Sequence, residues 1–271
     1  MRKGESVMRT RSVLPILAIF IVTVGITAGQ RGRGEPPPVA GVQQRTYRFT
    51  ETNEKIEYDV FVSNKVDKSK RKKSPLVIAL HGANEKPMGL MRSLTELADK
   101  GGYIVAAPTG YTLDGGYGVP ALRSQNPAAE KVAELSEKDV MEVLDLMRKE
   151  FNIDDRRIYL LGQSMGGGGA IHLGVKYSIW AALGLSAPAM SIQQPAMLET
   201  IKDMPVILVH GDADTTVDVD RILPWVDKMR ELKMTYEYYE MKGVGHHDAI
   251  ESGASRIFAF FDKHSKPKSD N

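Results

Sequence analysis

The sequence contains no cysteine among its 271 residues. This absence excludes disulfide bonds, thiolate metal sites, cysteine nucleophiles and a lipid-modified cysteine near the N-terminus. Hydrophobic residues make up 42% of the chain and charged residues 26%, which is the balance of an ordinary globular protein. The length is sufficient for one large domain with a full hydrophobic core, and no internal repeat or second domain is indicated.

A long apolar run is present near the N-terminus, over residues 13–28. It follows a basic segment that contains Arg2, Lys3, Arg9 and Arg11, and the small residues Ala28 and Gly29 end it. This order predicts a secretory signal peptide over residues 1–28 and export to the periplasm or the extracellular space. An uncleaved membrane anchor is the alternative, although the run is shorter than the roughly 20 residues that a spanning helix needs. Met8 is an alternative start.

An excess of positive charge is also absent once this segment is removed. The formal net charge is +2 for the whole chain, and residues 1–28 hold four basic residues and one acidic residue, which leaves −1 for residues 29–271. The sequence therefore predicts no nucleic-acid partner. The most basic segment, residues 65–73, has no large apolar side chain beyond Val66. We interpret it as a solvated loop rather than a membrane or polyanion site.

The remaining chain divides into a linker, one domain and a short tail. Residues 29–43 are rich in glycine and proline and are expected to form a linker. Alternating apolar residues in Tyr47–Thr50 and Ile56–Val62 predict an antiparallel pair of strands. We expect the domain to cover residues 44–265, with a polar tail at 266–271.

Five short apolar runs follow, of the kind found in parallel strands that are buried on both faces. They are Leu76–Leu80, Tyr103–Ala107, Ile158–Leu161, Ala181–Leu185 and Val206–Val209. Helical spacing predicts a helix capped by Ser136, a second from Met165, a third near residues 219–232 and a last one near 254–264. This alternation predicts a doubly wound, three-layer α/β domain with right-handed crossovers.

The run Ile158–Leu161 leads directly into Gly-Gln-Ser-Met-Gly at residues 162–166. The pattern Gly-x-Ser-x-Gly between a strand and a helix predicts a nucleophile elbow, in which the hydroxyl of Ser164 is exposed on a strained turn. The flanking glycines are expected where strand and helix pass too closely for a Cβ atom. The glycine run 166–169 does not predict a Walker-type phosphate loop, because no Gly-Lys-Ser/Thr follows.

A serine hydroxyl becomes a good nucleophile when a base takes its proton, and a carboxylate orients that base. On such a fold the chain order should be serine, acid, histidine. We assign the acid to Asp214, in the loop after the fifth apolar run, with Asp212 and Asp218 as alternatives. The base is assigned to His246, which follows a later strand, with the adjacent His247 as the alternative.

The oxygen anion of a tetrahedral intermediate needs N–H donors. The expected donors are the backbone N–H groups of Met165, directly after the nucleophile, and of Ala83 in the loop His81–Asn84. We interpret His81 as a structural residue that bonds the loop backbone rather than as a second base. No metal site is expected, because residues 246–248 are neighbours in a loop rather than spaced ligands.

Together these motifs resemble those of the α/β-hydrolase superfamily, from Ile56 to about Phe261. The marks are Leu80-His81-Gly82, the segment 162–166, Gly211-Asp-Ala-Asp214 and Gly245-His246. The stretch Phe151–Gly162 resembles exported esterases grouped with polyhydroxybutyrate depolymerases and feruloyl esterases, and is similar also to the catalytic domain of the prolyl oligopeptidase family. The resemblance implies a three-layer α/β-hydrolase sandwich that cleaves carboxylic esters through an acyl-enzyme, with no cofactor. Several secreted esterases of this group carry disulfides, which this chain lacks.

The substrate of such an enzyme is only partly indicated. Residues 186–205 are too few to form a large cap domain, so we expect an open site that admits a bulky or polymer-derived ester. The connection 109–135, with Tyr111 and Tyr117, is expected to line this site, and a flexible surface loop is the alternative. Two other functions fit the fold: a serine peptidase of the oligopeptidase type, without room for its propeller domain, and a non-enzymatic binding module.

Overall fold

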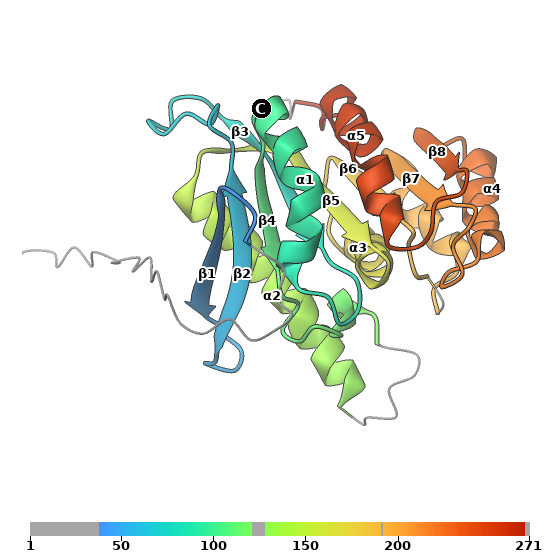
Figure 1. Cartoon of the computed structure of the whole chain (residues 1–271), viewed down its shortest axis with the longest axis horizontal. Helices are drawn as coiled ribbons and strands as arrows, with labels where there is room; N and C mark the ends of the chain where they lie inside the picture. Colours follow the sequence, from blue (N-terminus) through green and yellow to red (C-terminus); the bar gives the residue numbers. More distant parts are fainter. Residues whose placement is uncertain (1–37, 121–127, 191, 269–271) are drawn as a thin grey trace, which may run out of the picture. The chain divides into compact units, whose positions relative to one another are not determined.

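The computed structural model describes residues 38–120, 128–190 and 192–268 (Figure 1). The predicted signal peptide and most of the predicted linker lie outside the described residues. The linker was expected to reach residue 43, but the first strand already begins at Val42. Within the described part of the chain, no helix combines the length and apolar character that crossing a membrane requires.

The described residues form one eight-stranded sheet in the order β1-β2-β4-β3-β5-β6-β7-β8. The strands are β1 (Val42–Arg48), β2 (Lys55–Val62), β3 (Ser74–Leu80), β4 (Ile104–Pro108), β5 (Ile153–Gln163), β6 (Ala182–Ser186), β7 (Val206–Gly211) and β8 (Tyr236–Met241). Strand β2 pairs antiparallel with both β1 and β4, and the remaining pairs are parallel. A mostly parallel sheet with an antiparallel N-terminal hairpin is thereby confirmed.

In the part of the chain that the structure describes, five α-helices cover the two faces of this sheet. They are α1 (Pro87–Gly101), α2 (Ala129–Glu150), α3 (Met165–Lys176), α4 (Leu223–Glu231) and α5 (Asp248–Lys263). Helices α1 and α5 pack on one face and α2, α3 and α4 on the other. Strand β3 shows why both faces are apolar: Leu76 and Ile78 belong to one hydrophobic core and Val77 to the other. The three-layer prediction is confirmed.

Some helix boundaries differ from those expected. Ser136 was predicted to cap a helix, but α2 begins at Ala129 and Ser136 is buried inside it. Its hydroxyl accepts a hydrogen bond from the backbone N–H of Tyr117 (2.9 Å), so a tertiary contact explains the serine. Helix α5 begins at Asp248, earlier than expected. In the predicted tail, the backbone N–H of Lys266 donates to the Arg156 carbonyl (2.9 Å).

Four loops of interest lie at the same edge of the sheet. They follow β3, β5, β7 and β8. These strands all point in the same direction, because the pairs β3–β5, β5–β6, β6–β7 and β7–β8 are each parallel. Because the carboxyl ends of parallel strands share one edge, the loops after these strands converge there. This topology brings together residues that are more than a hundred positions apart in the sequence.

Candidate active site

Ser164 stands on a sharp turn between β5 and α3, with φ 53° and ψ −117°. A positive φ is a strained conformation for a residue other than glycine and persists only where its surroundings impose it. Here the carbonyl of Ser164 accepts from the backbone N–H groups of Gly167 (2.9 Å) and Ala189 (2.8 Å). A Cβ at Gly162 would collide with the carbonyl of Gly166, so the close passage of strand and helix needs glycine. The local structure is that of a nucleophile elbow.

The hydroxyl of Ser164 lies 2.8 Å from Nε2 of His246. On the other side of the same ring, Nδ1 lies 2.7 Å from Oδ2 of Asp214. Both His246 and Asp214 are 7% exposed. For the serine hydroxyl to donate to Nε2, the proton of a neutral imidazole must be on Nδ1, where Asp214 accepts it. The structure therefore forms a continuous hydrogen-bonded chain from the hydroxyl to the carboxylate.

The carboxylate of Asp214 is positioned by backbone hydrogen bonds as well as by His246. Its Oδ1 accepts hydrogen bonds from the backbone N–H groups of Thr216 and Val217, both at 2.8 Å. Burial acts to raise the pKa of this carboxyl, but the bonds from Val217, His246 and Thr216 outweigh it and lower the pKa below its usual value. The carboxyl is thus ionised at neutral pH and can stabilise a positively charged imidazolium.

The alternatives from the sequence occupy other positions. Asp212 accepts from the backbone N–H of Gly243 (2.6 Å), and Asp218 caps the short helix η3 (Val219–Arg221). His247 points to Glu85, with Nδ1 and Oε1 at 3.2 Å. Among the candidates, the geometry joins Ser164 to His246 and Asp214.

His210, a residue that sequence reasoning did not select, also contacts the acid. It is fully buried at the end of β7, where its Nε2 donates to the Val217 carbonyl (2.9 Å) and lies 3.4 Å from Oδ2 of Asp214. Burial lowers its pKa, which favours the neutral ring. Its position directly before Gly211-Asp-Ala-Asp214 is the signal that could have revealed it.

The loop after β3 is fixed by His81. This ring is fully buried, with Nδ1 2.8 Å from the Gly82 carbonyl and Nε2 2.9 Å from the Thr109 carbonyl. These contacts match the structural role expected for it. Within the described part of the chain, the backbone N–H groups of Ala83 and Met165 donate to no protein acceptor. Both are therefore free to bind a negatively charged oxygen.

The two tyrosines that were expected to line the site do not do so. Tyr117 is fully buried, with its ring 5.7 Å from that of His81, so it belongs to the core. The hydroxyl of Tyr111 donates to Glu54 (3.1 Å), in the turn that joins β1 and β2. The physical reason is that Asp139 accepts from the backbone N–H groups of Gly110 and Tyr111, which pulls this connection against α2.

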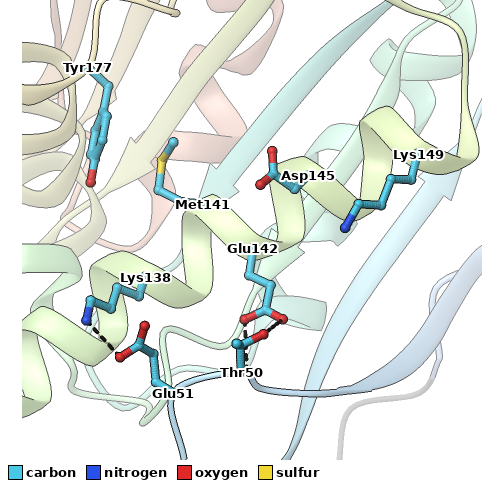
Figure 2. A pocket seen from close by; sticks show the side chains of 8 residues that line it. All are labelled: Thr50, Glu51, Lys138, Met141, Glu142, Asp145, Lys149 and Tyr177. Atoms are coloured by element: carbon cyan, nitrogen blue, oxygen red, sulfur yellow. Dashed lines mark hydrogen bonds and ion pairs between the residues drawn. The ribbon is translucent and has the colours of Figure 1, made fainter.

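A surface pocket lies elsewhere, on the outer face of α2 (Figure 2). It is lined by Thr50, Glu51, Lys138, Met141, Glu142, Asp145, Lys149 and Tyr177. Lys138 pairs with Glu51 (2.8 Å) and Thr50 donates to Glu142 (2.7 Å), so these polar groups already bind one another. None of the residues around Ser164 contributes to it. Among the described residues, no three or more His, Asp or Glu side chains are arranged so that they could hold a metal ion.

Comparison with known proteins agrees with this architecture. Residues 71–204 match the family described as "Serine aminopeptidase, S33". A curated relative is the bifunctional acetylxylan esterase/xylanase XynS20E of Neocallimastix patriciarum, which is 27% identical over 161 residues. That match covers 58% of this chain and 22% of the relative, so the chain spans only about a fifth of the relative's length.

Several solved structures share the fold. A thermostable esterase is 24% identical, with a TM-score of 0.64 over 83% of this chain and 64% of its own. An S-formylglutathione hydrolase from Agrobacterium tumefaciens is 15% identical, with a TM-score of 0.68 over 85% and 98% of the two chains. The ferulic acid esterase AmCE1/Fae1A of Anaeromyces mucronatus is 20% identical, with a TM-score of 0.62 over 86% and 94%. Together with the sheet order and the elbow, these matches show that the chain has the α/β-hydrolase fold.

Proposed function

We propose that this protein is an exported serine hydrolase that cleaves carboxylic esters, with Ser164 as nucleophile, His246 as base and Asp214 as the orienting acid. The observation that carries the proposal is the chain of hydrogen bonds from the Ser164 hydroxyl through His246 to Asp214. Export is supported by the signal-peptide pattern of residues 1–28.

The geometry supports a two-step reaction. His246 takes the hydroxyl proton as Oγ of Ser164 attacks the ester carbonyl, and Asp214 stabilises the resulting imidazolium. The N–H groups of Met165 and Ala83 bind the oxygen anion of the tetrahedral intermediate. Its collapse breaks the bond to the alcohol, which leaves with the proton from His246. Water then attacks the acyl-enzyme, His246 takes and returns a proton, and the free acid is released.

Esters are favoured over peptides by the names of the relatives. The curated relative is an acetylxylan esterase/xylanase, and ferulic acid esterases share the fold. The family description as a serine aminopeptidase makes a peptidase the second candidate. The connection from β6 to β7 contains only the short helix η2 (Pro195–Ile201) among its described residues. Without a cap built there, a bulky or polymer-derived ester can reach Ser164.

The first prediction tests this chemistry directly. Ser164→Ala should lower kcat/KM for a short-chain p-nitrophenyl ester by about four to six orders of magnitude, because the nucleophile is removed while the binding surface remains. Ser255→Ala, an exposed serine on α5, is the control and should leave the rate unchanged. Full activity of the Ser164→Ala protein would rule out the mechanism.

Two further measurements on the same preparation separate the alternatives. A matched amide turned over faster than the ester would favour the peptidase. Failure of an organophosphonate probe to label Ser164, combined with the absence of ester turnover, would favour a binding module on the same fold.

A further inference from the structure

Two loops from distant parts of the chain meet beside the proposed catalytic residues. Oε1 of Glu85, in the loop after β3, lies 3.2 Å from Nδ1 of His247, in the loop after β8. The two residues are 162 positions apart in the sequence. The pair therefore bridges the loop that holds one proposed oxyanion donor and the loop that holds the proposed base.

The carboxylate of Glu85 has a defined place in the first loop. The backbone N–H of Glu85 donates to the Gly82 carbonyl (3.2 Å), and Asn84 between them has a left-handed φ of 60°. A Cβ added at Gly82 would come within 2.9 Å of Oε2 of Glu85, so the carboxylate lies directly against this glycine. A negative charge is thus fixed within two residues of Ala83.

His247, the partner of Glu85, packs against the ring of His246 on the solvent side. The two rings meet edge to face, with centroids 5.4 Å apart. The side chain of His247 is 76% exposed, whereas His246 is buried. In the proposed reaction, His246 delivers its proton to the departing alcohol, so the alcohol is next to the His246 ring when it leaves. The Glu85–His247 pair therefore lies beside the residue that hands the proton to the alcohol in the proposed reaction.

We propose that Glu85, held by His247, is a specificity-determining residue for the alcohol half of the ester. It selects esters of uncharged, hydroxylated alcohols and rejects esters whose alcohol carries a carboxylate or a sulfate. The carboxylate accepts hydrogen bonds from neutral hydroxyl groups but repels a like charge. This inference rests on the proposed ester hydrolysis, and it adds a substrate class that the triad alone does not define.

The test compares two acetyl esters that differ in one charge on the alcohol, phenyl acetate and 3-acetoxybenzoate. Glu85→Gln should raise kcat/KM for 3-acetoxybenzoate about fivefold to tenfold, the effect of removing a like charge several ångströms away in a partly exposed site. The rate with phenyl acetate should stay within about twofold. Because the difference is electrostatic, it should shrink at 0.5 M salt.

Two controls locate the effect. Glu96→Gln removes the same charge from an exposed residue farther along α1 and should leave both rates unchanged. Phenyl hemisuccinate carries its carboxylate on the acyl side, and Glu85→Gln should change its rate much less than that of 3-acetoxybenzoate. An equal gain with both anionic esters would overturn the assignment to the alcohol side.

The remaining outcomes are also distinct. If the wild-type protein does not hydrolyse phenyl acetate, the proposed function fails and this inference fails with it. If it hydrolyses phenyl acetate and Glu85→Gln leaves the ratio of the two rates unchanged, the inference alone is wrong. A loss of rate with every ester would show that Glu85 supports the loop structure and does not select substrates.

Discussion

At the scale of single residues, Asp59 is a buried carboxyl outside the proposed active site. It lies on β2 and is only 4% exposed. Burial raises its pKa to about 7, the nearby Glu57 adds to this, and Lys86 acts in the opposite direction. The folded protein therefore favours the uncharged form of this carboxyl over much of the acidic range.

The sign of the resulting pH dependence follows from linkage. The pKa of Asp59 is higher in the folded state than its ordinary value of 3.8, so its contribution to stability is fully present below pH 4 and is lost as the pH rises to about 7. Asp59→Asn should remove this loss, and its free energy of unfolding should exceed that of the wild type at pH 8 by about 2 to 4 kcal/mol. Urea denaturation at pH 4.5 and pH 8 measures the difference.

A neighbouring carboxylate provides the comparison for this experiment. Glu57 lies on the same strand but is exposed, so Glu57→Gln should change the free energy of unfolding by less than about 0.5 kcal/mol. If wild type and Asp59→Asn show parallel pH profiles, the buried carboxyl is not the source of the pH dependence.

Residue by residue, the sequence identified the side chains whose chemistry has a local signal. Ser164 lies in a pentapeptide with a defined turn, and the expected order along the chain pointed to Asp214 and His246, which the structure brings together. Tyr117 had no such signal, because its burial depends on how distant elements pack. Glu85 and His247 also had no such signal, because they are 162 positions apart and come into contact only when the chain folds.

At the scale of elements, helix α3 is unusual in beginning with a run of glycines. Glycine disfavours a helix by about 1 kcal/mol per residue relative to alanine, so packing must compensate. A Cβ at Gly166 would collide with the carbonyl of Leu80 on β3, and one at Gly167 with Pro188. The close approach of α3 to the sheet thus depends on residues that weaken the helix by itself.

A pair of matched substitutions tests this balance. Gly166→Ala should destabilise the protein by about 3 kcal/mol or more, because a rigid backbone carbonyl occupies the space of the new methyl group. Gly89 is exposed in the first turn of α1, and a Cβ atom added there would meet no atom within 4 Å. Gly89→Ala should therefore stabilise the protein by up to about 1 kcal/mol. Urea unfolding of both variants measures the two effects, and equal changes would refute the packing explanation.

The elements themselves were predictable to different degrees. Parallel strands buried on both faces are near-continuous apolar runs, so β3 to β7 could be located from composition. Helix starts were less secure, as α2 shows, since Ser136 resembles a cap but serves a contact with Tyr117. Helix α1 was not specified, although it begins with Pro87 and ends at a left-handed Gly102.

At the scale of the whole molecule, charge is unevenly distributed. Residues 64–73 contain six basic residues and one acidic residue, a net charge of +5, so the rest of residues 29–271 carries −6. The loop is ordered by Asp67, whose carboxylate accepts from the backbone N–H groups of Ser69, Arg71 and Lys72. The side chains of its basic residues from Lys68 onward are exposed.

Such a local excess of charge should govern adsorption more than the net charge does. At pH 8 and low ionic strength, the protein without residues 1–28 should bind a sulfonate cation exchanger despite its net charge of −1. Lys70→Glu with Lys72→Glu should abolish retention. Lys202→Glu with Lys242→Glu, which changes the net charge equally at other exposed positions, should retain it. Identical elution of the two double variants would contradict the expectation.

The order of the site along the chain also sets when it can be assembled. Ser164 precedes His246 by 82 positions, and at a synthesis rate of about 5 to 20 residues per second the proposed base follows the proposed nucleophile by roughly 4 to 16 s. The strand, turn and helix around Ser164 are thus made before the segment that holds His246 and the helix α5 that follows it. During synthesis, the growing polypeptide therefore contains the proposed nucleophile for several seconds before the proposed base has been added.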